Sequence, residues 1–252
     1  MADAVLSDGV WYVRNALDAV EWNVVDVNDG SGWTVVDSDS FLQSVATSTS
    51  KVMTFKNAGI ASSANNDLQL PKGNPNKFVR WYKNLTDNDG NNITTNDHFD
   101  MMTEITVYAP SNKEKLAVAI GYCVDPTDDN PTTALYMGAF HKYTSDSANP
   151  SLGAMTSANS SHTTDANAHA VKVVTTLLGL RQGVIGYEVL NSSDAHVANS
   201  SRTQNTTLSA DTQLKLYVAF GIHGTSVTFA DGKDIQCVMR YKIIKWNDSG
   251  LP

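Results

Sequence analysis

Charged side chains are scarce in this sequence of 252 residues. Asp, Glu, Lys and Arg make up 17% of it, well below the ~25% of an average soluble domain. The 26 acidic residues outnumber the 18 basic ones, which gives a formal net charge of −8. Phosphate binding requires clustered Lys and Arg, and neither end of the chain, MADAVLSDGV or KWNDSGLP, is basic. The composition therefore argues against nucleic acid as the main partner.

Long apolar runs and cysteines are also scarce. No stretch approaches the ~18 consecutive apolar residues of a membrane span, so we expect no membrane insertion. The first twenty residues lack the basic and apolar regions of a signal peptide, and we expect synthesis in the cytosol. The two cysteines, Cys123 and Cys237, lie in strand-like runs. Without a signal peptide, free thiols are favoured over a disulfide, and we interpret both as small buried side chains.

Short runs of β-branched and aromatic residues are abundant, and polar turn-rich segments separate them. In 235–246 the residues alternate between an apolar face and a mixed face, as in an antiparallel sheet with one face on a core. The runs lie at 22–27, 33–37, 51–56, 78–84, 99–109, 115–124, 134–142, 170–180, 184–190, 214–222, 225–229 and 235–246. They predict an all-β fold, an antiparallel two-sheet sandwich of jelly-roll or concanavalin-like type. We expect one β-sandwich domain over 51–252, with an N-terminal extension over 1–50 that packs on or links to neighbours.

Two segments have a helical pattern. In SDGVWYVRNALDAVEW, Ser7 or Asp8 can cap a helix whose apolar residues follow at i, i+3 and i+4 spacing. The same segment can instead begin a strand at Trp11, but we expect a short N-terminal helix. FLQSV, at 41–45, is a second possible helical turn.

Polar connections between the runs are unusually long. They cover 57–76, 85–98, 125–133, 143–169 and 191–212. Connections beyond ~12–15 residues are usually functional or disordered. We expect 143–169 and 191–212 to make contacts between subunits.

The segment DHFDMMTEI places several polar side chains on one face of a strand. Alternation puts His98, Asp100, Met102 and Glu104 together. Asp100 and Glu104 then stand ~13 Å apart at ~3.3 Å per residue, whereas a glycosidase pair is ~5–9.5 Å apart. The E-x-D-x-x-E string of concanavalin-class glucanases is also missing. We therefore expect no enzymatic activity and no catalytic residues.

TDNDGNN resembles a calcium-binding loop, because Asp87 and Asp89 place oxygen ligands beside the turn at Gly90. The full loop pattern fails, since Leu85 occupies the first ligand position and Asn96 the position of the bidentate acid. An Asp-Gly pair also forms a turn without any metal. We expect no metal or other cofactor, and Asp87 and Asp89 are the candidates if Ca²⁺ binds.

Aromatic and imidazole side chains are the remaining candidates for surface contacts. Tyr and Trp can stack on sugars, while neighbouring Asp and Asn hold the hydroxyls. In a sandwich any one aromatic residue can instead belong to the core. The contact candidates are Trp81, Tyr82, Tyr143, His162 and His169.

The chain as a whole resembles virus and bacteriophage virion proteins. Ser/Thr/Asn-rich strands, few charges, polar connections and the short Asp-Ser-Gly-Leu-Pro end share that style. The resemblance implies a homo-oligomeric structural unit of the virion, with copies of itself and other virion proteins as partners. The lack of a basic arm favours an outer capsid decoration, a fibre or a tail component. The alternative is a lectin-like module that binds a glycan on the host surface.

Overall fold

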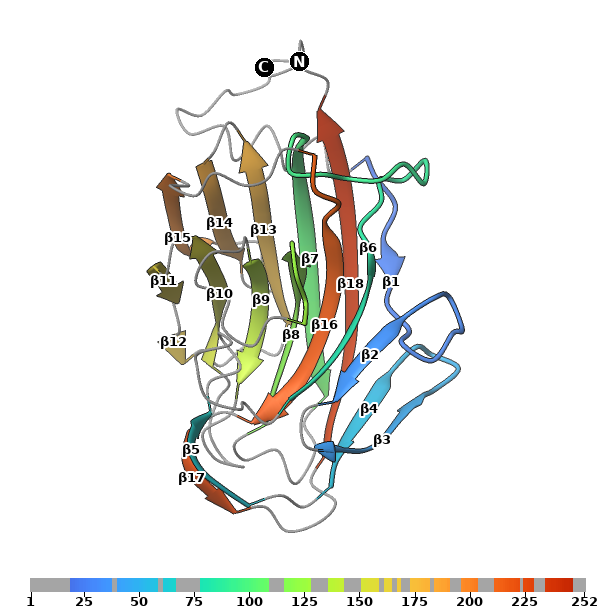
Figure 1. Cartoon of the computed structure of the whole chain (residues 1–252), viewed down its shortest axis with the longest axis vertical. Helices are drawn as coiled ribbons and strands as arrows, with labels where there is room; N and C mark the ends of the chain where they lie inside the picture. The colour runs from blue at the N-terminus through green and yellow to red at the C-terminus, as the bar shows by residue number, and fades with distance from the viewer. Residues whose placement is uncertain are drawn as a thin grey trace.

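The chain forms a β-sandwich in the computed structural model (Figure 1). The structure describes residues 19–37, 40–58, 61–66, 78–108, 116–127, 136–142, 151–158, 161–164, 167–168, 173–181, 184–190, 196–203, 211–222, 224–228 and 234–246. No α-helix occurs in these ranges. None of their segments is a helix long and apolar enough to span a membrane.

One eight-stranded antiparallel sheet, called sheet A, has the order β15-β14-β13-β7-β18-β4-β3, and β1 pairs with β18. Its longest strands, β7 and β18, lie side by side in the middle and carry the DHFDMMTEI and 235–246 segments. Its strands are β1 (Asn23–Val24), β3 (Leu42–Thr47), β4 (Met53–Asn57), β7 (His98–Tyr108), β13 (Val173–Arg181), β14 (Val184–Leu190), β15 (His196–Thr203) and β18 (Asp234–Trp246).

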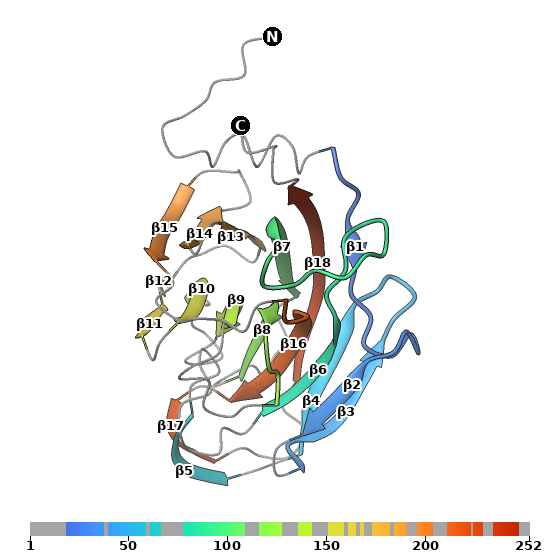
Figure 2. The same ribbon diagram turned by 45° about the horizontal axis from the view of Figure 1, so that its top comes forward.

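The second eight-stranded sheet, called sheet B, has the order β11-β10-β9-β8-β16-β6-β2, and β12 pairs with β10. Its strands are β2 (Thr34–Asp37), β6 (Phe78–Asn84), β8 (Leu116–Cys123), β9 (Tyr136–Lys142), β10 (Ser151–Ala158), β11 (Ser161–Thr164), β12 (Asn167–Ala168) and β16 (Lys215–Ile222). A separate two-stranded sheet joins β5 (Ala61–Asn66) to β17 (Gly224–Thr228). Figure 2 shows sheets A and B as two facing layers, with the β5–β17 pair at one end.

The apolar core lies between the two sheets. On β7, Phe99, Met101, Ile105 and Val107 face it, and on β18 Ile235, Cys237, Met239 and Ile243 do so. This alternation confirms the two-faced pattern predicted for 235–246. Aromatic rings fill the centre, with ring centroids 4.9 to 5.4 Å apart in the pairs Phe41–Phe220, Phe55–Trp81, Phe55–Phe220 and Phe99–Tyr122.

These sheets confirm the all-β, antiparallel, two-sheet prediction. Each sheet already has eight strands in the described part, as many as a whole jelly roll, so the jelly-roll alternative finds no support. The predicted N-terminal helix falls mostly in residues 1–18, outside the described residues. Its described end, 19–22, is not helical. FLQSV is not a helical turn, because β3 pairs with β4 there.

Several segments interpreted as loops contain strands. β5 lies within 57–76, β10 to β12 lie within 143–169, and β15 lies within 191–212. Ser, Thr, Asn and Ala give these strands no apolar alternation, but their backbones pair with neighbouring strands. Residues 23–47, within the segment assigned to an extension, supply β1 and β3 to sheet A and β2 to sheet B.

Candidate functional site

The connection from β6 to β7, residues 85–97, forms a compact loop at one end of the sandwich and is called the 85–97 loop. Leu85 and Ile93 are fully buried in the core and anchor it. The Leu85 amide donates to the Leu214 carbonyl at 2.8 Å, and the Ile93 and Leu214 amides donate to Leu85 and Ile93 carbonyls at 2.9 Å. The loop is therefore fixed to the segment before β16 by its backbone.

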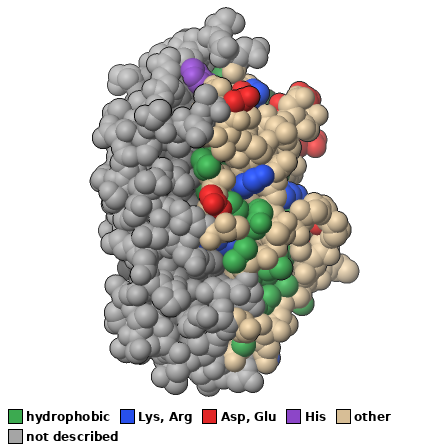
Figure 3. Space-filling model, in the orientation of Figure 1, with side chains coloured by type: hydrophobic (Ala, Val, Ile, Leu, Met, Phe, Trp, Pro, Cys, Tyr) green, Lys and Arg blue, Asp and Glu red, His purple; other side chains and the backbone are tan. Residues whose placement is uncertain are grey.

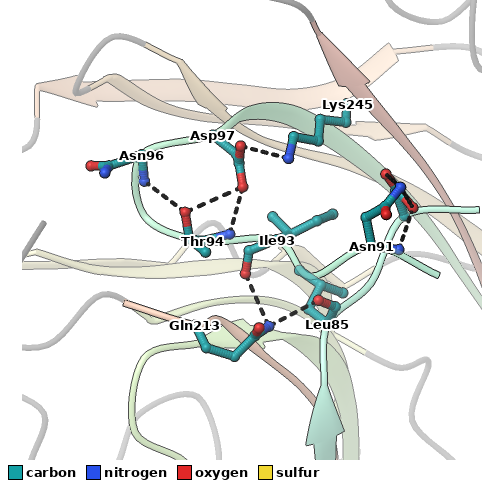
Figure 4. Close-up of polar contacts among 9 residues, drawn as sticks. Leu85, Asn91, Ile93, Thr94, Asn96, Asp97, Gln213 and Lys245 are labelled. Atoms are coloured by element: carbon teal, nitrogen blue, oxygen red, sulfur yellow. Dashed lines mark hydrogen bonds and ion pairs between the residues drawn. The ribbon is translucent and has the colours of Figure 1, made fainter. Parts of the chain in front are cut away.

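Gln213 reinforces this junction from below the loop (Figure 4). Its side-chain Nε2 donates to the carbonyls of Leu85 and Ile93, at 3.0 Å each, and of Leu214, at 2.7 Å. Each of these carbonyls also accepts a backbone amide, and because a carbonyl oxygen has two lone pairs, the Gln213 amide adds a second hydrogen bond to each. One amide thus holds both arms of the loop.

The tip of the 85–97 loop is a turn closed by Asp87. Its Oδ1 accepts from the backbone amides of Asp89 at 3.0 Å and Asn91 at 2.8 Å. The Asn91 side chain also donates to both carboxylate oxygens. Gly90 has φ +83°, a conformation that glycine adopts without strain. Asp87 therefore has a turn-closing role that requires no metal.

No group of three or more His, Cys, Asp or Glu side chains suited to a metal gathers within the described residues. Asp89 lies at the exposed tip beside Asp87. Ca²⁺ at this pair stays a prediction from the sequence.

The second half of the loop is tied to the end of β18. Asp97 accepts from the Thr94 amide at 2.8 Å and hydroxyl at 3.2 Å, and its other oxygen is 2.7 Å from Lys245 Nζ (Figure 4). Burial by itself raises the pKa of Asp97, but the hydrogen bonds from Lys245 and Thr94 outweigh it and lower that pKa. Asn88 Nδ2 donates to the Ile243 carbonyl at 3.1 Å.

Three side chains remain directed to solvent from this rigid frame. Asp89, Asn92 and Asn96 are exposed, and within the described part of the chain their side-chain oxygens and nitrogens have no hydrogen-bond partner. A carboxylate accepts hydrogen bonds, and an amide both donates and accepts them. The loop thus presents a fixed set of donors and acceptors to a polar ligand.

The outer face of sheet A, turned away from sheet B, carries the polar set predicted on β7. Trp246 Nε1 donates to Asp100 at 2.6 Å, and Glu104 forms an ion pair with Arg240 at 2.7 Å. Each carboxylate therefore contacts a different residue of β18, Asp100 with Trp246 and Glu104 with Arg240. The Trp22 ring lies against Arg240 and Lys242, at 4.4 and 4.8 Å from its centroid.

The predicted contact residues do not come together in the described residues. Trp81 is 5% exposed and packs on Phe55 in the core, which argues against a role in stacking on a ligand. Tyr82 is half-buried on the outer face of sheet B, against a cluster around Tyr217. His162 lies on β11, the edge strand of sheet B. Tyr143 and His169 lie outside the described residues.

Both cysteines are free thiols, as predicted, and both are buried. Burial raises the pKa of each thiol, that of Cys123 to about 12. Protonated thiols are poor nucleophiles, so neither has the reactivity of a catalytic cysteine.

No protein-family model matches this chain, and no curated protein matches its sequence. Solved structures with a similar fold include the basic winged bean lectin with Tn-antigen, at a TM-score of 0.47 and 8% identity over 89% of this chain and 98% of that one. Another is the exoplasmic/lumenal domain of VIP36 in its Ca²⁺/Man3GlcNAc-bound form, at 0.49 and 11% over 92% and 90%.

A third is the CBM2 module of the evolved Dit of Lactobacillus casei BL23 phage J-1, at a TM-score of 0.46 and 9% identity over 89% of this chain and 97% of that one. These likenesses concern the fold, and at TM-scores below 0.5 they carry no weight for function.

Proposed function

We propose that this chain is a lectin-like module that binds a glycan through the 85–97 loop. The observation that carries the proposal is the exposed set of Asp89, Asn92 and Asn96 on a loop that Gln213 and Lys245 hold in place. Sugars present many hydroxyls that each donate and accept, and carboxylate and amide groups match them. A loop ordered before binding loses little conformational entropy when the ligand arrives.

The proposal predicts that removal of two amides weakens glycan binding. The double variant Asn92→Ala/Asn96→Ala loses side-chain hydrogen bonds of about 1 kcal/mol each, which together lower affinity about tenfold or more. A glycan array identifies the ligand for the purified full chain, and isothermal titration calorimetry then compares the variants.

Asn23→Ala is the matched control, because Asn23 is an exposed amide on β1, outside the 85–97 loop. Binding that is equal in the double variant and the wild type, or absent with every glycan on the array, would refute the proposal. The same titration in EDTA tests the calcium prediction at Asp87 and Asp89. Loss of binding on chelation, with recovery on added Ca²⁺, supports the metal.

A second candidate is a homo-oligomeric structural unit of a virion, such as an outer capsid decoration, a fibre or a tail component. One observation favours it: the two segments predicted to contact other subunits, 143–169 and 191–212, contain β11 and β15, the edge strands of sheets B and A. Edge strands offer unpaired backbone groups to another chain. The two functions are compatible in a particle that attaches to cells through this module, and neither involves catalysis.

Hydrogen exchange on the purified chain tests the structural candidate. Assembly of the chain without any ligand supports this candidate. In the assembled state the β11 and β15 amides should exchange slowly, and their exchange should become faster on dilution. A monomer at all concentrations, whose amides in 143–169 and 191–212 exchange as fast as those of an unstructured peptide, contradicts it.

A further inference from the structure

β2 is the edge strand of sheet B on the side opposite β11, and it pairs only with β6 among the described residues. Its other backbone edge is therefore free within that part of the chain. Val35, in the middle of the strand, is 53% exposed and is one of the few exposed large hydrophobic residues in the described part. Hydrophobic side chains gather over the β6 and β2 region of the face in Figure 3.

Val35 marks the rim of the core. It is paired with Trp81, whose side chain lies in the core, so alternation places Val35 on the inner face of sheet B. Its exposure means that the apolar layer between the sheets is open at this rim. A strand added beyond β2 would cover it.

We infer that the free edge of β2 binds the same edge of a second copy of this chain, antiparallel, about a two-fold axis at Val35. A two-fold axis perpendicular to the sheet keeps the inner faces of both copies on the same side of the joined sheet. Residues that stand opposite each other must therefore both point to the inner face or both to the outer face. The register centred on Val35 meets that condition, and it pairs Val35 with Val35 of the second copy and Thr34 with its Val36. The two neighbouring registers set Val35 against Asp37 or against Trp33, which already packs on the core of its own chain.

Charge also fits this register. It places Asp37 of the second copy opposite Trp33, and Lys83 Nζ lies 4.6 Å from the centroid of the Trp33 ring. The register thus puts the Asp37 position of each copy opposite the Trp33 that lies beside Lys83 in the other, and the two Asp37 positions at opposite ends of the strand pair. Opposite charges across a strand pair stabilise it and like charges directly opposite destabilise it.

Sedimentation velocity of the full chain over a range of concentrations tests the inference. The wild type is expected to form a dimer, and Val35→Lys, which brings two like charges together at the axis, is expected to raise the dimer dissociation constant at least about tenfold. Val24→Lys is the matched control, since Val24 is 46% exposed on β1, outside the β2 edge, and it should leave the dimer unchanged. A monomeric wild type, or a Val35→Lys dimer as tight as the wild type, overturns the inference.

A second variant excludes misfolding as the cause. Val35→Cys should form a disulfide-linked dimer with oxidised glutathione, because Cβ atoms directly opposite in a strand pair are ~4.5–5.5 Å apart. Val24→Cys should not, and the native thiols Cys123 and Cys237 are buried. Equal cross-linking of Val35→Cys and Val24→Cys contradicts an interface at the β2 edge. Dimerisation is measured without glycan and glycan binding on Val35→Lys, so the inference and the proposed function can fail separately.

Discussion

The two edge strands on one side of the sandwich are β2 of sheet B and β3 of sheet A (Figure 1), and they differ in whether a side chain covers the outer backbone edge. The edge of β3 is occupied by Asn28, whose Nδ2 is 3.3 Å from the Val45 carbonyl and 3.3 Å from Thr47 Oγ1. No side chain within the described residues caps the β2 edge in this way. Proteins protect edge strands against pairing with other chains, so an edge without protection indicates a place for a partner.

The protection of β3 depends on one carboxylate. Asp26, which follows β1, accepts from the Asn28 amide at 3.0 Å, Thr47 Oγ1 at 2.9 Å and Lys51 Nζ at 2.8 Å. It thereby ties the β1–β2 connection to the β3–β4 hairpin, and this places Asn28 against the strand edge. Asp26 is 8% exposed, so its charge depends on these donors for its solvation.

Removal of the Asp26 carboxylate is expected to have the largest effect on stability among the changes that test this difference between the two edges. Asp26→Ala deletes three hydrogen bonds to a nearly buried charge, and hydrogen bonds to charged groups contribute about 1.5–3 kcal/mol. We expect a loss of about 2 kcal/mol in the free energy of unfolding, measured by urea denaturation. Asp29→Ala is the control, because Asp29 is exposed and accepts from the Ser31 amide alone, and its effect should stay within about 0.5 kcal/mol.

The same pair of variants can be measured against pH. Burial alone raises the pKa of Asp26, but the hydrogen bonds from Lys51, Thr47 and Asn28 outweigh it, and the pKa lies below the usual 3.8. A carboxyl whose pKa is lower in the folded state contributes stability above its unfolded pKa, and that contribution disappears as the pH falls through the folded value. The difference between wild type and Asp26→Ala should be constant at neutral pH and shrink below about pH 4. A difference that grows on acidification would show that Asp26 is not a stabilising anion.

The sequence predicted the central strands well. Twelve apolar or aromatic runs correspond to strands, and in β7 and β18 the alternation also identified the buried face. β3 was missed because Leu42 and Val45 are three residues apart, which imitates a helical face, while a bulge near Gln43 breaks the strand alternation. β10 and β15 were missed because Ser, Asn and Ala have no apolar period. Their pairing partners, and not their own side chains, decide their structure.

The candidate site was only half predictable. Asp87, Asp89 and Gly90 form a local turn signal, and the turn is present. Gln213 has no such signal, since its bond to Ile93 joins residues 120 positions apart in the sequence. Lys245 belongs to an alternating strand and gives no sign of its ion pair with Asp97. Contacts of this range follow from the order of the strands in the sheets, which the sequence pattern left open.

The smallest expected effect belongs to Asn28, and it tests the comparison most directly. Its two bonds to β3 are long and exposed, so Asn28→Ala should cost about 0.5 kcal/mol of stability. In the monomeric Val35→Lys background, however, the same change frees the Val45 carbonyl and should restore weak self-association through β3, visible by sedimentation velocity at high concentration. Asn23→Ala in that background is the control. If the Asn28→Ala/Val35→Lys chain stays monomeric, Asn28 is not what closes the β3 edge, and the contrast between the two edges needs another cause.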